Sequence, residues 1–199
     1  MSNDELNRYD RQIRAWGFET QRRLHSCKFL FLGLNEASLE CMKNLILAGA
    51  AEVSFTDTED AIEKYSTNIK FMTDLNPLCP ANLIQLDTVL SADRSGLIQE
   101  EIEKYDFLCI FKSTIDLIKQ ASQSQKTILI SFGKAGDIIY LQPEYSPVSE
   151  NAEFSPLEQT VFGALLSQVI VDHLPPIEQP IAYRLVYDPI NLSSSVQQI

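Results

Sequence analysis

One stretch of the chain carries residues whose spacing could bind a phosphate group. Residues 29–38 read FLFLGLNEAS, an apolar run followed by Gly33 and the start of an amphipathic helix. In a G-x-G-x-x-G turn, the second glycine lets the backbone approach a phosphate and the third lets the helix pack closely. Here Asn35 and Ser38 take those places, and the Glu36 carboxylate enters the first helical turn, where it repels phosphate. The sequence therefore predicts a degenerate glycine loop, an ordinary strand–turn–helix connection without a nucleotide.

Asp57 is the acid that could contact a ribose. It follows a predicted strand at 52–56 and stands about 20 residues after the glycine turn, where dinucleotide-binding folds place an acid on the ribose hydroxyls. An acid at the end of a strand is also common without any ligand. We interpret Asp57 as a relic of such a site and expect no cofactor to bind at this turn.

The basic segment 9–17, YDRQIRAWG, could perform phosphate chemistry of another kind. Arg11 and Arg14 are three residues apart and share one face of a helix. One interpretation is a solvent-exposed face on which Arg11 pairs with a carboxylate, and the spacing alone favours it. The other is that one arginine reaches a bound triphosphate, because a guanidinium is permanently charged and donates parallel hydrogen bonds to phosphate oxygens.

Alternating strands and helices must position these residues. Short apolar runs predict strands at 28–32, 52–56, 83–86, 107–111, 127–132, 138–141 and 182–187. Periodic apolar residues predict helices at 4–15, 19–26, 36–50, 95–105, 115–122 and 158–174, the first capped by Asp4 and the third by Asn35. This alternation predicts an α/β fold with a doubly wound, mostly parallel, Rossmann-like sheet.

The pattern predicts a single domain over residues 1–199. Residues 143–157 hold three prolines and few apolar residues, which indicates a loop or linker. Residues 58–80 show a less regular pattern, interrupted by Asn76-Pro77 and Cys79-Pro80. The polar tail 193–199 is expected to fray.

Composition bounds the class of protein. The formal net charge is −11, which argues against a nucleic-acid binder, and no apolar run approaches the roughly 18 residues that span a bilayer. The four cysteines form no CxxC pair, so we expect no metal site. Three of them lie in apolar runs, which favours buried free thiols in the cytosol or nucleus.

Several segments together resemble a known family. They are YDRQIRAWG at 9–17, QRRL at 21–24, FLFLG at 29–33 and KNLILAG at 43–49. In these the chain is similar to the smaller, non-catalytic subunit of SUMO-activating enzymes, within the ubiquitin-like-protein activating enzymes and their bacterial relatives ThiF and MoeB. The run at 161–170 resembles the late glycine-containing helix of that family.

The resemblance implies a ThiF-type adenylation fold and a heterodimer. The larger subunit would bind ATP and Mg²⁺, adenylate the C-terminal glycine of a SUMO-like modifier, and then form a thioester on its own cysteine. The smaller subunit would be a regulatory pseudo-enzyme that binds no cofactor or metal itself. By position in the motif, Arg11 would reach across the interface to the ATP phosphates in trans. The implied location is the nucleus and cytoplasm.

The chain also departs from the family pattern. Active adenylating relatives carry S-N-L-x-R-Q, whereas residues 56–72 read TDTEDAIEKYSTNIKFM, with Asn68 in register, Lys70 near the arginine position and no glutamine. The segment 143–157 replaces a longer inserted helical domain, so this is a shortened form. The alternatives are a homodimeric ThiF-like adenylating enzyme, a subunit of the Nedd-type activating enzyme, and a pseudo-enzyme that acts only as a scaffold.

Overall fold

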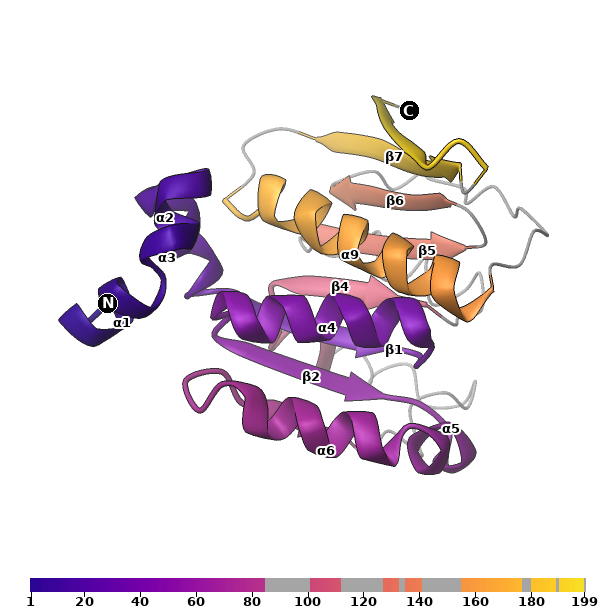
Figure 1. The fold of residues 1–199 in the computed structure, drawn as a ribbon, viewed down its shortest axis with the longest axis horizontal. Coiled ribbons are helices and arrows are strands. Elements are labelled where there is room, and N and C mark those ends of the chain that lie inside the picture. Colours follow the sequence, from indigo (N-terminus) through magenta and orange to yellow (C-terminus); the bar gives the residue numbers. More distant parts are fainter. Residues whose placement is uncertain are drawn as a thin grey trace.

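Eight strands in the described part of the chain form one sheet (Figure 1). The computed structural model describes residues 1–84, 101–111, 127–132, 135–140, 155–176, 180–188 and 190–198. The strands are β1 (Lys28–Leu32), β2 (Glu52–Thr56), β3 (Ala81–Leu83), β4 (Phe107–Ile110), β5 (Thr127–Phe132), β6 (Ala135–Tyr140), β7 (Ile181–Asp188) and β8 (Ser193–Gln198). Their order across the sheet is β3-β2-β1-β4-β5-β6-β7-β8. The pairs from β3 to β5 are parallel and those from β5 to β8 are antiparallel, so the sheet is mostly parallel, as predicted.

The central strands are buried along almost their whole length. Phe29 in β1 lies opposite Val53 in β2 on one side and Phe107 in β4 on the other. Continuous apolar runs of this kind are typical of parallel strands that are covered on both faces. The sequence therefore predicted β1 and β2 with their observed bounds, and β4 to within one residue.

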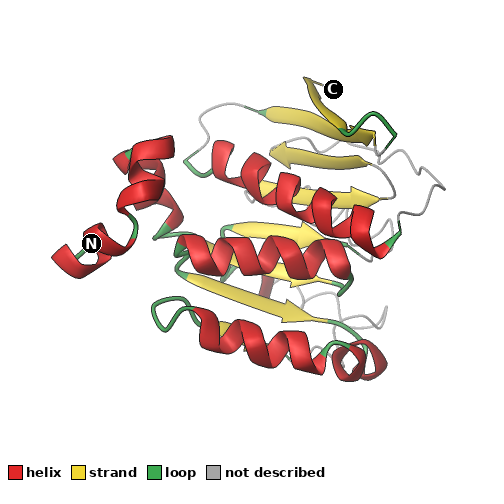
Figure 2. Cartoon of the chain, in the orientation of Figure 1, coloured by secondary structure: helices red, strands yellow, loops and turns green. Residues whose placement is uncertain are grey.

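The helices whose bounds fall wholly within the described residues lie on one face of the sheet and beside one end of it (Figures 1 and 2). They are α1 (Asn3–Arg8), α2 (Asp10–Trp16), α3 (Phe18–Leu24), α4 (Glu36–Ala48), α5 (Glu59–Lys64), α6 (Ser66–Leu75) and α9 (Pro156–Asp172). In Figure 1, α4, α6 and α9 cover the face, while α1, α2 and α3 stand beside the end where α4 finishes. The helix predicted at 115–122, and most of the one at 95–105, lie outside the described residues. Within the described residues, no helix combines the length and apolarity that crossing a bilayer requires.

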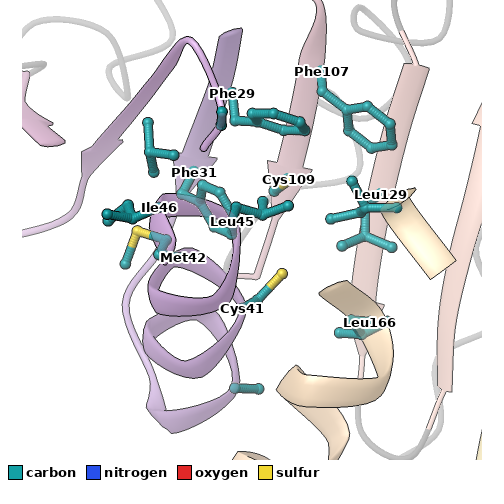
Figure 3. Close-up of a cluster of buried hydrophobic side chains, with 14 of the residues drawn as sticks. Phe29, Phe31, Cys41, Met42, Leu45, Ile46, Phe107, Cys109, Leu129 and Leu166 are labelled. Atoms are coloured by element: carbon teal, nitrogen blue, oxygen red, sulfur yellow. The ribbon is translucent and has the colours of Figure 1, made fainter. Parts of the chain in front are cut away.

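The core lies between α4, α9 and the central strands (Figure 3). Met42, Leu45 and Ile46 of α4 are fully buried against the sheet. At the neighbouring helix, a Cβ on Gly163 would lie 2.2 Å from the carbonyl oxygen of Ala37, so a glycine is needed for α9 to approach α4 this closely. This contact places Gly163 of α9 against the first turn of α4, and further along both helices Asn44 Nδ2 donates to Ser167 Oγ at 3.2 Å.

The N-terminal helical segment differs from the prediction. The expected helix at 4–15 is two helices that meet at Tyr9, and the N-cap is Ser2 rather than Asp4. Ser2 Oγ accepts the Glu5 backbone N–H and the Glu5 carboxylate accepts the Ser2 N–H, which makes a capping box. At Tyr9 the backbone leaves the helical conformation, with φ −101° and ψ 12°, and the side chain is buried, at 1% exposure.

Three further predictions need correction. Residues 58–80 contain α5 and α6, because Thr58 caps α5 through its side chain, and the expected breaker at Asn76 marks the end of α6. The tail expected to fray forms β8, which pairs antiparallel with β7. The strand predicted at 83–86 is β3, which starts two residues earlier and ends at Leu83; residues 85–86 lie outside the described residues.

The predicted linker at 143–157 lies outside the described residues as far as 154. Its last residues belong to α9, because Ser155 is the N-cap, with a capping box to Glu158, and Pro156 is the first helical residue. The helix predicted at 158–174 therefore begins and ends two residues earlier. The prediction of one domain over 1–199 stays a prediction.

Candidate functional site

The turn between β1 and α4 is where a nucleotide-binding fold would hold a phosphate. Gly33 has φ +98°, a conformation that favours glycine, and its N–H donates to the Thr56 carbonyl at 2.9 Å. Asn35 caps α4, as predicted: its side-chain oxygen accepts the Ser38 backbone N–H at 2.8 Å, and Ser38 Oγ accepts the Asn35 N–H at 2.9 Å. The backbone N–H groups of Asn35 and Ser38 are thus bonded to the chain's own side chains and are not open to an anion.

Two carboxylates reinforce this closure. Asp57, interpreted above as a relic, accepts the Leu34 N–H at 2.6 Å and the Thr58 N–H at 2.7 Å, so its carboxylate is held against the turn itself. The Glu36 carboxylate in the first turn of α4 accepts a hydrogen bond from the Tyr65 hydroxyl at 3.1 Å. Gly33, Asn35, Glu36, Ser38 and Asp57 therefore lie together, but their negative charge and satisfied N–H groups do not fit a phosphate.

A pocket of about 270 Å³ adjoins this turn between α4, α6 and α9. It is lined by Glu36, Leu39, Glu40, Lys43, Asn68, Phe71, Met72 and Thr160. Its lysine, Lys43, donates to both oxygens of Glu40 at 2.6 Å and is thus already neutralised. Asn68 lines the pocket, while Lys70, two residues further along α6, is exposed. The lining thus offers carboxylates and an apolar floor, which does not suit a triphosphate.

Arg11 is placed quite differently from Arg14. Arg14 lies four residues after Asp10 and pairs with its carboxylate at 2.8 Å. Arg11 is exposed on α2 and makes no ion pair or hydrogen bond with any residue in the described ranges. The interpretation in which a carboxylate of this chain pairs with Arg11 is therefore wrong for the described residues. An exposed guanidinium without such a partner is free to meet an anion from another molecule.

Arg11 and the glycine turn lie at opposite ends of α4. The segment that carries Arg11 is fixed to the last turn of α4, where Gln21 Nε2 donates to the Ala48 carbonyl at 2.7 Å. The glycine turn precedes the first turn of the same helix. Since α4 has 13 residues, its two ends are about 20 Å apart. This separation exceeds the reach of an arginine side chain, so Arg11 and the turn do not form one site within a single chain.

The four cysteines are buried free thiols, as predicted. Burial raises the pKa of Cys27 and of Cys79 to about 12, and it also raises the pKa of Cys41 and of Cys109 well above the usual thiol value. A thioester-forming cysteine must reach its thiolate form near neutral pH. These thiols do not meet that requirement.

Comparison with solved structures supports the fold. A crystal structure of PaaA superimposes with a TM-score of 0.71, covers 100% of this chain and 84% of that chain, and shares 14% identity. At an identity this low, the match supports the fold and no statement about function. The predicted α/β fold with a Rossmann-like sheet is confirmed. No family model matches the chain.

Comparison with curated proteins identifies the relatives. The zebrafish protein is 42% identical over 64 residues, and the human protein is 46% identical over 59 residues. Both carry the same name. The chain resembles SUMO-activating enzyme subunit 1. An Arabidopsis protein, SUMO-activating enzyme subunit 1A, is 30% identical over 107 residues, or 53% of this chain.

The resemblance to SUMO-activating enzyme subunit 1 predicted from the sequence is thus confirmed over part of the chain. The match covers 32% of this chain and 18% of the zebrafish protein, and 33% of the Arabidopsis protein. The chain therefore matches less than two thirds of the length of these relatives. Activity and partners of the full-length relatives do not transfer on this basis alone.

Sequence reasoning missed the residues that hold the Arg11 segment. Tyr9, Gln21 and Asn76 are each buried, and they connect α1–α3 to the end of α4. Gln21 and Asn76 are polar residues at buried positions, which a sequence pattern reads as exposed or as a helix breaker. One signal was present: Tyr9 lies inside the basic segment on which the family resemblance rests.

Proposed function

We propose that this chain is the non-catalytic subunit of a heterodimeric SUMO-activating enzyme, and that Arg11 acts in trans at the ATP site of the larger subunit. The observation that carries the proposal is the pairing pattern on α2: Arg14 is neutralised by Asp10, whereas Arg11 is exposed and unpaired among the described residues. The similarity to SUMO-activating enzyme subunit 1 supports the choice of reaction.

The chemistry requires positive charge from outside the catalytic subunit's own loop. When the modifier carboxylate displaces pyrophosphate from ATP, negative charge develops on the phosphate oxygens and on the leaving group. The larger subunit would supply Mg²⁺, which this chain is not proposed to bind. Arg11 would add a fixed cation that donates two hydrogen bonds, in the manner of an arginine finger.

The closed turn supports a division of labour between the subunits. The Asn35–Ser38 capping box, together with Asp57 and Glu36, closes the turn between β1 and α4 to a phosphate. A self-sufficient ThiF-like homodimer would need that turn to be open. We therefore propose that ATP, the modifier C terminus and the thioester all lie on the larger subunit. The proposed location of the complex is the nucleus and cytoplasm.

The test is modifier-dependent ATP–pyrophosphate exchange by the catalytic partner. It compares the wild-type chain, Arg11→Ala, Arg14→Ala and no added chain. Hydrogen bonds to charged groups contribute about 1.5–3 kcal/mol, so Arg11→Ala should lower exchange by about 10- to 150-fold. Arg14→Ala is the matched control, because it removes an arginine from the same exposed helix and should change exchange less than about 2-fold.

The same assay separates the alternatives. Equal exchange in all four samples would favour the alternative in which this chain is a pseudo-enzyme that acts only as a scaffold. Exchange that responds to a Nedd-like but not to a SUMO-like modifier would point to the Nedd-type enzyme. A self-sufficient adenylating enzyme would show exchange with this chain alone, and ATP would raise its melting temperature.

A further inference from the structure

The last turn of α4 receives two buried side-chain amides. A helix leaves its final carbonyls without partners inside the helix, and they need other donors when they are buried. The Ile46 carbonyl accepts Asn76 Nδ2 at 2.7 Å, and the Ala48 carbonyl accepts Gln21 Nε2 at 2.7 Å. Gln21 and Asn76 are 0% and 1% exposed. These two residues therefore complete the C terminus of α4.

The same two amides also hold both ends of α2. Asn76 Nδ2 lies 3.0 Å from the Tyr9 hydroxyl and donates to it as well, and Tyr9 immediately precedes α2. Gln21 Oε1 accepts the Trp16 indole N–H at 3.0 Å, and Trp16 is the last residue of α2. Arg11 lies between these two attachment points. Its helix is thus tied at each end to the same turn of α4.

Gly49 leaves room for the Tyr9 and His25 rings at the end of α4. It ends α4 in the left-handed conformation, with φ +87°. A Cβ at this position would lie 2.6 Å from the Tyr9 hydroxyl and 2.7 Å from the His25 ring. The glycine thus leaves the space that the Tyr9 ring fills, and Tyr9 packs edge-on against His25 with the ring centroids 5.0 Å apart.

We infer that the C terminus of α4 is a socket for α2, and that Tyr9 and Gln21 are positioning residues for Arg11. This inference rests on the proposed function of Arg11 in trans. An arginine that acts across an interface must approach the phosphates from a fixed direction, because a displacement of about 1 Å can reduce a rate about 100-fold. A seven-residue helix gains little rigidity by itself, so the socket supplies it.

The test is a double-mutant cycle on the same exchange assay. Tyr9→Phe removes the hydroxyl that accepts from Asn76, while the Asn76 bond to Ile46 is retained. Gln21→Met removes both hydrogen bonds of Gln21 at similar volume. Each should lower kcat of the assembled heterodimer by about 3-fold to 100-fold, with a smaller change in the KM for ATP. The loss cannot exceed that of Arg11→Ala.

The decisive readout is the same pair of changes in the Arg11→Ala background. If Tyr9 and Gln21 act through Arg11, neither change lowers kcat further there. Tyr105→Phe is the matched control: it removes the hydroxyl of a buried tyrosine that contacts Ser54 rather than the N-terminal helices, and kcat should stay within about 2-fold. Heterodimer affinity, measured by calorimetry, should be unchanged in every variant.

The outcomes separate the inference from the function it rests on. If Arg11→Ala lowers exchange but Tyr9→Phe and Gln21→Met do not, the socket is not a positioning device and the function stands. If both changes lower kcat equally with and without Arg11, their role is general stability, and the inference fails. If Arg11→Ala itself has no effect, both the trans role and the socket's purpose are overturned.

Discussion

Gly163→Ala is the change that most directly tests how α9 is seated on α4. A Cβ added to Gly163 would lie 2.2 Å from the Ala37 carbonyl oxygen and 2.9 Å from the Ala37 Cα. These are backbone atoms in the first turn of α4, so no side-chain rotation can relieve the contact. One helix must move away from the other.

The magnitude follows from two opposing effects. Adding a methyl group to a packed core typically costs about 1–3 kcal/mol, and sometimes more. Replacing glycine by alanine inside a helix contributes about 1 kcal/mol in the other direction. Because the clash is with backbone and the flanking Phe162 and Leu166 are fully buried, we expect the upper part of the packing range. The net loss in the free energy of unfolding is then about 1–2 kcal/mol.

Urea unfolding followed by circular dichroism measures this loss. Thr160→Ala, on the same helix but only partly buried, is the control for helix propensity and should change stability by less than about 0.5 kcal/mol. Adding Ala37→Gly to Gly163→Ala should not restore stability, because the contacting Ala37 atoms are backbone. A Gly163→Ala chain as stable as wild type, or more so, refutes the close approach of the helices.

Two further changes test other parts of the structure. Arg184→Met should lower the free energy of unfolding by about 3–5 kcal/mol, because it removes the guanidinium that pairs with the fully buried Asp137 at 2.6 Å. Urea unfolding should show recovery when Asp137→Leu is added, and no recovery would contradict the ion-pair argument. Since burial raises the pKa of Cys27 and Cys79 to about 12, about one thiol in 10⁴ is thiolate at pH 8. Iodoacetamide should therefore label the native chain far more slowly than the urea-unfolded chain, as followed by mass spectrometry, and equal rates would show that these thiols are accessible.

The centre of the fold could be predicted because local and global signals agree there. β1 and β2 read as uninterrupted apolar runs, and burial on both faces of a parallel sheet demands that pattern. Asn35 was predicted as a cap because capping depends on residues three apart. β8 could not be predicted, since SSSVQQ has no apolar period and its order comes from backbone pairing with β7.

At the candidate site, the sequence identified the residues but not all of their partners. The closure of the turn by Asn35 and Ser38 could be predicted from the sequence, because a capping box joins residues only three positions apart. Asp10 pairs with Arg14 rather than with Arg11 because of helix geometry. Residues four apart lie on the same face of a helix, whereas adjacent residues such as Asp10 and Arg11 do not. The socket could not be predicted from the sequence, because its Asn76–Tyr9 and Gln21–Ala48 hydrogen bonds join residues that are 67 and 27 positions apart.

The two ends of α4 explain how a closed turn and an available arginine coexist in one chain. At the N terminus, the positive end of the helix dipole is met by the chain's own carboxylate, Glu36, and by a capping box. At the C terminus, the carbonyls of Ile46 and Ala48 bind the amides that hold α2. The two arrangements share no side chain and are about 20 Å apart, so a change at one has little energetic coupling to the other. Closing the turn at the N terminus of α4 therefore leaves the placement of Arg11 at the other end intact, and a chain with a closed turn can still present a fixed, exposed cation.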